Sequence, residues 1–191
     1  MAHLGNGASL CAMEAGRSRE TTMSFTALDG LPMGTRCGAL DPGAVLYLQG
    51  QHDFDEDALQ HLLYHESGLL GLSGIDSDMA VLLESEAPEA RRAIDFFVYR
   101  AAQEMGRMAV ALGGVDGIVF TAGIGEHAAP IREAIIERLT PLWSVRLDSD
   151  ANRGDSPRLI SSEDSAITVR VVPTDEEAML AEHTWQLWRS H

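Results

Sequence analysis

An apolar strand that runs directly into a glycine turn is the feature that most constrains this chain. Residues 116–127 read Asp-Gly-Ile-Val-Phe-Thr-Ala-Gly-Ile-Gly-Glu-His, and Pro130 is placed to open the helix that follows. Glycines in such a turn can take positive φ and bring bare backbone close to a ligand, which favours a phosphate or nucleotide site. A plain βα turn is the competing interpretation, because Gly123-Ile124-Gly125 lacks the third glycine of a dinucleotide fingerprint.

A second glycine turn, Gly5-Asn6-Gly7, lies near the start of the chain and precedes the apolar residues 8–13. Asn-Gly between hydrophobic residues predicts a β-hairpin. Only Met1 to Leu4 precede the turn, so the incoming strand would be very short. We therefore expect the chain to begin inside a domain that lacks its opening strand.

Composition excludes several classes of function. With 191 residues, 45% of them hydrophobic, the chain can bury one sizeable core, and its net charge of −15 argues against binding nucleic acid or an anionic membrane surface. All 14 basic residues are arginine, so no Walker lysine exists. The longest apolar runs fall short of the ~20 residues of a membrane span. Two cysteines form neither a disulfide framework nor a zinc spacing, so a cytoplasmic location is expected.

Hydrophobic periodicity and turn residues predict an α/β chain with a layered sheet, because strands alternate with helices in its second half. Strands are predicted at 8–14, 20–25, 116–121 and 167–172, and helices at 42–50, 55–66, 76–85, 88–112, 130–140 and 175–189. The clearest helix, 88–112, ends at Gly113-Gly114 and carries one apolar face, made of Ile94, Phe97, Val98, Ala101, Ala102, Met105, Met108 and Leu112. Residues 148–164 are rich in Asp, Ser, Gly and Asn, which is typical of a polar loop.

A third candidate site follows the last predicted strand, at Pro173-Thr174-Asp175-Glu176-Glu177. Carboxylates at the carboxyl end of a strand are suited to Mg²⁺. An ordinary capping box, with Thr174 as N-cap and Glu177 three residues later, explains the same residues. Both interpretations can hold together if Glu176 points to a ligand.

A fourth candidate site is the glycine-rich loop at residues 30–42, in which Arg36 has room to reach a planar anion. An ion pair between Arg36 and Asp29 or Asp41 is an equally good interpretation. The neighbouring Cys37 is interpreted as structural, because no histidine lies near it in the sequence.

Two further patterns favour ordinary structure. His61 and His65 are four residues apart, but no third ligand follows at a metal-binding spacing, so a solvated helix face is expected. Trp185 and Trp188 favour a core or subunit contact over a stacking platform.

These segments together resemble the acetate kinase family, which includes acetate and propionate kinases. The matching motifs, in family order and spacing over essentially the whole chain, are His3-Leu4-Gly5-Asn6-Gly7, residues 22–26, residues 31–38, residues 120–126 and residues 173–177. The resemblance implies the actin-like ATPase fold, which is ribonuclease H-like and is shared by sugar kinases, Hsp70 and actin. It also implies ATP-dependent phosphoryl transfer to acetate, giving acetyl phosphate and ADP.

The resemblance further implies a role for each matching residue. Arg36 would stabilise the transferring phosphoryl group, and Glu176 would help to hold Mg²⁺ or Mn²⁺. The expected partners are ATP or ADP and a short-chain carboxylate, within a homodimer. Nucleotide would be bound by His3, Leu4, Gly5, Asn6, Gly7, Asp78, Met79, Ala80, Gly123, Ile124, Gly125, Glu126 and His127.

The chain also departs from the family pattern. Acetate kinases are roughly twice as long, so residues 1–191 are expected to form a single partial domain, the C-terminal nucleotide-binding half, without the N-terminal domain. Ala80 replaces a usual arginine, His127 and Asp175 each replace an asparagine, and Ser24 replaces a glycine. Two hypotheses follow: a kinase that works only when the other half is supplied, or a non-catalytic nucleotide-binding or dimerisation remnant. Propionate or butyrate are alternative substrates.

Overall fold

The computed structural model describes residues 1–52, 54–154 and 158–189. The strands are β1 (Ala2–Leu4), β2 (Ala8–Glu14), β3 (Arg17–Thr21), β4 (Gly117–Thr121), β5 (Arg158–Leu159) and β6 (Thr168–Val171). The helices are α1 (Pro42–His52), α2 (Glu56–His65), α3 (Gly68–Ser73), α4 (Met79–Glu84), α5 (Pro88–Leu112), α6 (Ala122–His127), α7 (Ala129–Trp143), α8 (Ser149–Arg153) and α9 (Glu176–Arg189).

One mixed sheet, in the order β3-β2-β1-β4-β6-β5, organises the molecule. The short strand β1 lies at its centre, antiparallel to β2 and parallel to β4. The turn at Gly5-Asn6-Gly7 therefore does join a hairpin, and a strand of three residues enters it. The same turn lies beside the end of β4, because His3 pairs with Thr121. This pairing brings the two glycine turns of the sequence together.

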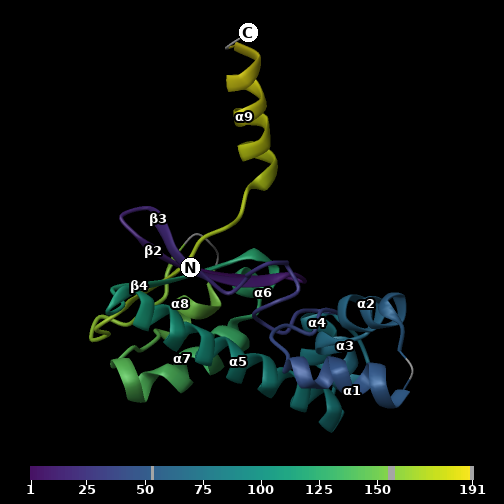
Figure 1. The fold of residues 1–191 in the computed structure, drawn as a ribbon. Helices are drawn as coiled ribbons and strands as arrows, with labels where there is room; N and C mark the ends of the chain where they lie inside the picture. Colours follow the sequence, from purple (N-terminus) through teal and green to yellow (C-terminus); the bar gives the residue numbers. More distant parts are fainter. Residues whose placement is uncertain (53, 155–157, 190–191) are drawn as a thin grey trace.

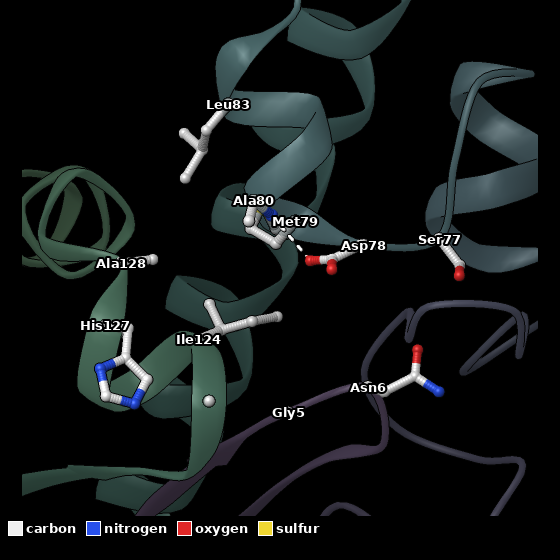
Figure 2. Close-up of a pocket in the computed structure, with 11 residues that line it drawn as sticks. Gly5, Asn6, Ser77, Asp78, Met79, Ala80, Leu83, Ile124, His127 and Ala128 are labelled. Carbon is white, nitrogen blue, oxygen red and sulfur yellow. Dashed lines mark hydrogen bonds between the residues drawn. The ribbon is translucent and has the colours of Figure 1, made fainter.

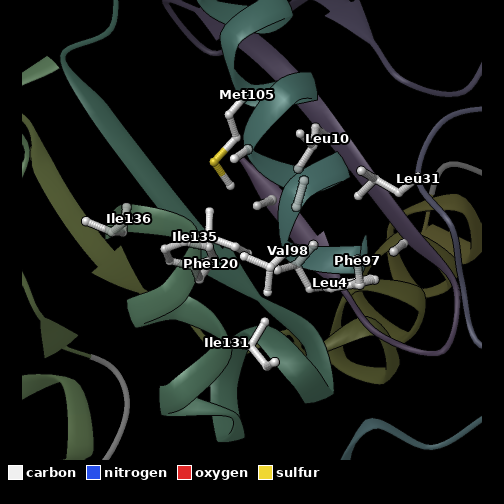
Figure 3. Packing of buried hydrophobic residues seen from close by; sticks show 14 of the residues in the cluster. Leu4, Leu10, Leu31, Phe97, Val98, Met105, Phe120, Ile131, Ile135 and Ile136 are labelled. Atoms are coloured by element: carbon white, nitrogen blue, oxygen red, sulfur yellow. The ribbon is translucent and has the colours of Figure 1, made fainter. Parts of the chain in front are cut away.

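The core lies between this sheet and the long helix α5 (Figures 1 and 3). Leu4 and Leu10 from the hairpin, and Phe120 from β4, face Phe97, Met105 and the rest of the α5 stripe. Helix α7 closes one side with Ile131, Ile135 and Ile136. At about 25 cal/mol per Å² of apolar surface, such burial is the main contribution to the stability of the fold.

Helix α5 has the bounds that the sequence predicts, because its ends carry strong signals. Pro88 occupies the first turn, where its missing N–H is not needed. Gly113 ends the helix in the left-handed conformation, with φ of 73°. Six of the eight predicted face residues are buried, while Ile94 and Leu112 pack against the core at its margin.

Several predicted bounds need correction. Strand β3 covers Arg17–Thr21 rather than 20–25, because a tight turn at Ala15-Gly16, with φ of 50° and 74°, sets the pairing of Glu14 with Arg17. Helix α4 begins at Met79, three residues later than predicted, because the Asp78 carboxylate caps it. The segment interpreted as a polar loop contains α8 and β5, and the short α3 was not predicted.

Helix α9 extends away from the rest of the molecule (Figure 1). The predicted capping box is wrong: Asp175 caps the helix by accepting from the Ala178 N–H at 2.9 Å, while Thr174 donates to Glu126 instead. Trp185 and Trp188 stack at 5.0 Å between ring centroids but remain exposed, so they do not belong to the core of this chain. No helix within the described residues combines the length and the hydropathy that crossing a membrane requires.

Candidate functional site

A pocket of about 580 Å³ opens where the two glycine turns meet helix α4 (Figure 2). Its volume lies within the range of roughly 300–1,000 Å³ that small-molecule sites occupy. Three separate segments of the chain line it, namely the β1–β2 turn, the start of α4, and α6 with the residue after it. The lining residues are Gly5, Asn6, Ser77, Asp78, Met79, Ala80, Leu83, Gly123, Ile124, His127 and Ala128.

The floor of the pocket is fixed by close packing between the Asn6 turn and the Arg36 loop. The Gly34 N–H donates to the Asn6 carbonyl oxygen at 2.9 Å. A Cβ atom on Gly34 would lie 1.9 Å from Asn6 Oδ1, so only glycine allows this approach. The α3 amides of Leu69 and Leu70 in turn donate to the carbonyl oxygens of Met33 and Gly34. The loop is therefore held against the turn from both sides.

Arg36 lies at one side of this floor, half-buried. Its Nη1 donates to the Ala27 carbonyl oxygen at 3.2 Å and contacts Met33 Sδ at 3.7 Å. The same nitrogen would lie 3.8 Å from a Cβ on Gly7, which places the guanidinium beside the glycine turn. The alternative ion pairs are not formed in the described part of the chain, since Asp29 accepts from Ser24 and Gly30, and Asp41 from Gly43. Most of the Arg36 N–H donors have no protein partner in the described part of the chain.

The β4–α6 junction carries local backbone strain, but not where the glycines predict it. Ala122, with φ of 66°, takes the left-handed conformation, whereas neither Gly123 nor Gly125 has positive φ. The Glu126 carboxylate holds this turn by accepting from the Ala122 N–H at 3.0 Å, and it also accepts from the Thr174 N–H at 3.0 Å. Glu126 thus ties the junction to the segment that leads into α9.

A buried arginine supports the junction from below. Arg132 is 1% exposed and donates to the carbonyl oxygens of Gly125 and Glu126, at 2.9 and 3.0 Å, and to Asn152 Oδ1 at 2.8 Å. Burial, with a smaller contribution from the charge of Arg158, lowers the pKa of Arg132 to about 10, so the side chain stays charged at neutral pH. A cation at the carbonyl end of α6 is electrostatically favourable.

Eight of the thirteen predicted nucleotide-site residues line the pocket. The five others play different parts: Leu4 is fully buried in the core, and Gly125 packs against Phe120, where an added Cβ would lie 3.4 Å from the Phe120 carbonyl carbon. His3 is half-buried in β1, Gly7 faces Arg36, and Glu126 positions the junction. Gly123 differs from Gly125 in its surroundings, since a Cβ on Gly123 would meet nothing within 4 Å. It faces the space that a ligand would occupy.

Three lining residues were not predicted as site residues: Ser77, Leu83 and Ala128. Asp78 could have indicated the first two, because a capping aspartate marks where a helix begins and which residues flank its first turn. The Asp78 carboxylate accepts from the Ala80 N–H at 2.9 Å, so its cap fixes the wall that Ala80 and Leu83 contribute (Figure 2).

The predicted metal site stays a prediction. The side chain of Glu176 lies outside the described residues. Within those that are described, no three or more His, Cys, Asp or Glu side chains gather closely enough to bind a metal ion. His61 and His65 are no exception, since their rings lie 5.3 Å apart on an exposed helix face and His61 Nε2 contacts Glu66 at 3.3 Å.

Comparisons with a family model and with curated proteins point to the same family. A family model described as the acetokinase family matches residues 1–182. An acetate kinase of Rhodopseudomonas palustris (strain TIE-1) is 54% identical over 188 residues, which cover 98% of this chain and 47% of the relative. An acetate kinase of Rickettsia felis is 49% identical over 183 residues, covering 95% of this chain and 47% of the relative.

Solved structures agree with this match. The crystal structure of Porphyromonas gingivalis acetate kinase superposes with a TM-score of 0.91 at 35% identity, covering 98% of this chain and 48% of that one. A propionate kinase from Francisella tularensis gives a TM-score of 0.88 at 37% identity, covering 94% and 47%. The predicted fold is thereby confirmed. The chain spans about half the length of the relatives that it matches.

Proposed function

This chain belongs to the acetokinase family, and we propose that it forms the nucleotide-binding wall of an enzyme that transfers the γ-phosphoryl group of ATP to acetate. The observation that carries the proposal is the pocket itself. Three segments far apart in the sequence converge on one cavity, and Arg36 lies at its glycine-turn side. Propionate, the substrate class in the name of one structural neighbour, is the alternative acceptor.

The walls of the pocket differ in chemical character. Its α4 and α6 walls present Ala80, Leu83 and Ile124, which suit the flat apolar faces of a nucleoside base. The Asn6 turn, beside Arg36, presents backbone and amide groups suited to phosphate oxygens. We therefore propose that the base lies against α4 and α6, with the phosphates directed toward Asn6.

In the proposed reaction, a carboxylate oxygen of acetate forms a bond to the γ-phosphorus as the bond from that phosphorus to the β,γ-bridging oxygen breaks. ADP leaves with the electron pair of the broken bond. Negative charge on the equatorial oxygens is the main obstacle, and Arg36 would neutralise part of it with donors that the protein leaves unused. A divalent cation, held by phosphate oxygens and Glu176, would neutralise more when bound, and Mg²⁺ is the proposed ion.

The competing proposal is a nucleotide-binding module without turnover. Ala80 supports it, because an alanine on the pocket wall offers no charged contact to phosphate. The share of the relatives that the chain covers also supports it, since in-line transfer needs a carboxylate held opposite the nucleotide.

Calorimetry tests the binding step. We expect the 191-residue chain to bind ATP and ADP, and Gly123→Val to weaken binding at least tenfold while the protein stays folded, because the new side chain would enter open pocket space. Gly50→Val is the matched control, since a Cβ at Gly50 also meets nothing within 4 Å but lies away from the pocket. Equal affinity in all three proteins would refute the proposed position of the nucleotide.

Trapping acetyl phosphate with hydroxylamine tests the chemical step. We expect no detectable product from the chain alone, because the loss of in-line positioning can remove ~7 kcal/mol of barrier lowering, or about 10⁵-fold in rate. Product should appear when an N-terminal half from a relative is supplied, and Arg36→Ala should abolish it. Substantial product from the chain alone, abolished by Arg36→Ala, would show that the other half is dispensable.

We also propose that the chain forms a homodimer. The predicted apolar face of α5 is buried in the core of this chain. The dimer contact would therefore involve apolar side chains that remain exposed, such as Phe96, Tyr99 and Val110 of the same helix. Sedimentation at tens of micromolar tests this, and a monomer at that concentration would contradict it.

A further inference from the structure

The chain contains two asparagines, and their surroundings differ. Asn152 is 1% exposed, and its side chain accepts from Arg132 Nε at 2.8 Å and donates to the Ala129 carbonyl oxygen at 3.1 Å. Asn6 is exposed, and among the described residues its side-chain amide has no hydrogen-bond partner. The protein therefore fixes one asparagine side chain and leaves the other accessible to solvent.

The residue that follows the exposed asparagine is Gly7. Its backbone N–H donates to no acceptor within the described part of the chain. Glycine also has no side chain that would shield this nitrogen. Only three atoms, the carbonyl carbon, Cα and Cβ of Asn6, separate the Gly7 nitrogen from Asn6 Cγ. A bond between this nitrogen and Cγ therefore closes a five-membered ring, and no hydrogen bond of either group has to break first.

The fold also polarises the peptide group that joins Asn6 to Gly7. The Gly34 N–H donates to the carbonyl oxygen of this peptide group at 2.9 Å. When the Gly7 nitrogen loses its proton, negative charge spreads to that oxygen, and a donor already in place there stabilises the charge. The Asn6 side chain lies beside the same contact, at the edge of the pocket near Ser77 (Figure 2).

We propose that Asn6 is a modification site, at which the side-chain amide converts to a carboxylate without an enzyme. The Gly7 nitrogen gives its proton to a base in the solvent and forms a bond to Asn6 Cγ. The bond from Cγ to the side-chain nitrogen then breaks, and this nitrogen leaves as ammonia after taking a proton from water. A second water molecule opens the ring at either of its two carbonyl carbons, which gives aspartate or isoaspartate.

The consequence for the pocket rests on the proposed function. Asn6 lines the pocket, and the Arg36 guanidinium lies beside Gly7. A carboxylate at position 6 adds negative charge where we place the phosphate oxygens, and it competes with them for the Arg36 donors. Isoaspartate also lengthens the backbone by one methylene group in the turn that Gly34 contacts closely. The conversion therefore weakens nucleotide binding, and a bound nucleotide slows the conversion.

Peptide mapping of the full chain after incubation at mildly alkaline pH measures the modification. Trypsin releases residues 1–17 and 147–153, and each of these peptides contains one asparagine. We expect Asn6 to gain the mass of the amide-to-acid change roughly tenfold faster than Asn152, or more. Isoaspartate should be among the products at position 6, because it arises only through the ring. Equal rates at the two asparagines, or aspartate alone at position 6, would overturn the proposal.

A glycine variant separates the chemistry from the fold. Gly7 does not have positive φ, and the nearest atom to an added Cβ would be Arg36 Nη1 at 3.8 Å, so Gly7→Ala should melt within about 2 °C of the unsubstituted chain. The same Cβ obstructs the approach to Asn6 Cγ and should slow the conversion by about tenfold or more. Gly50→Ala, which leaves the Asn6–Gly7 pair intact, is the matched control. An unchanged rate in Gly7→Ala would contradict attack by the Gly7 nitrogen.

ADP, added at a saturating concentration, tests the link to the pocket. We expect ADP to slow the conversion about threefold or more. In calorimetry, Asn6→Asp should weaken ADP binding about tenfold. If ADP binds but neither effect is seen, the stated consequence for the pocket is wrong. If ADP does not bind to the unmodified chain, the proposed function is wrong, and the rates at Asn6 and Asn152 still decide whether Asn6 is a modification site.

Discussion

Two arginines, Arg132 beneath the pocket and Arg36 beside it, differ in how many of their donors the protein itself uses. Arg132 is buried and donates to Asn152 and to the carbonyl oxygens of Gly125 and Glu126. Arg36 is half-buried and donates to a single carbonyl oxygen, that of Ala27. Because a guanidinium has five N–H donors, the first is largely satisfied by the protein and the second is not. Unused donors beside a cavity, more than charge itself, are the reason for proposing Arg36 as the functional arginine.

Replacing the buried Arg132 should have the largest effect on the stability of the protein. Arg132→Ala would leave the Gly125, Glu126 and Asn152 acceptors unsatisfied and open a cavity, which should cost about 3 kcal/mol or more in the free energy of unfolding. Urea denaturation measures this loss. Arg132→Lys keeps the charge but loses the planar fork, so its free energy of unfolding should lie between those of the unsubstituted protein and Arg132→Ala. If Arg132→Ala lowered the free energy of unfolding by less than ~1 kcal/mol, Arg132 would not stabilise the fold more than Arg36 does, and the proposed difference between the two arginines would be wrong.

A pair of glycine variants sharpens the comparison at the pocket floor. Gly34→Ala should destabilise the protein by about 1–3 kcal/mol, because the new Cβ would lie 1.9 Å from Asn6 Oδ1 and must displace that side chain. Gly123→Ala should change stability by less than ~1 kcal/mol, because a Cβ there meets only open space. Denaturation curves of both variants measure the difference, and similar losses would contradict the packing described for Gly34.

The half-buried arginine should behave in the opposite way to the buried one. We expect Arg36→Ala to change the free energy of unfolding by less than ~1 kcal/mol, since it removes one hydrogen bond at a partly solvated site. Affinity for ATP should fall about tenfold, as for the loss of one charge-assisted contact, while affinity for AMP changes little. Calorimetry with both nucleotides, with Arg36→Lys as the partial rescue, measures this. An equal loss for both would show that Arg36 does not face the terminal phosphates.

The last pair of variants concerns the Glu126 carboxylate, which links the junction to the segment that leads into α9. Glu126→Gln keeps an oxygen that can accept from the Ala122 and Thr174 amides but loses the charge, so stability should fall by less than ~1 kcal/mol. Glu126→Ala removes the acceptor and should cost roughly 1–3 kcal/mol. Equal losses would mean that the negative charge, rather than the accepted hydrogen bonds, holds Ala122 in its strained conformation.

Sequence signals predicted the parts of the candidate pocket that depend on local chemistry. The bounds of α5 followed from Pro88 and Gly113, and the two glycine turns were predicted as parts of one site. The strained residue was missed, because Ala122 takes a conformation that glycine normally supplies, held by a hydrogen bond to a residue four positions later. Local propensity cannot show such tertiary compensation.

Arg132 was missed for a different reason. In the sequence it lies within a predicted helix, where an arginine is normally exposed. Its main partner, Asn152, belongs to a segment interpreted as a polar loop, which in fact contains α8. A buried polar pair between two such segments becomes visible only once the chain is folded. The N-cap of α9 was misassigned for the same reason, because the Thr174 hydroxyl donates a hydrogen bond to Glu126, which is distant in the sequence.

The central position of β1 also has a consequence for how the chain folds. The hairpin of β1 and β2 can form from neighbouring residues, but Ala2 must then pair with Phe120, roughly 120 residues later. At a synthesis rate of ~5–20 residues per second, the hairpin waits on the order of 6–24 s for its second neighbour to be made. During that interval the β1 edge that later pairs with β4 is open, and open strand edges invite pairing with other chains. The edge of β1 is therefore most exposed to misassembly in the interval between the synthesis of the hairpin and the synthesis of β4.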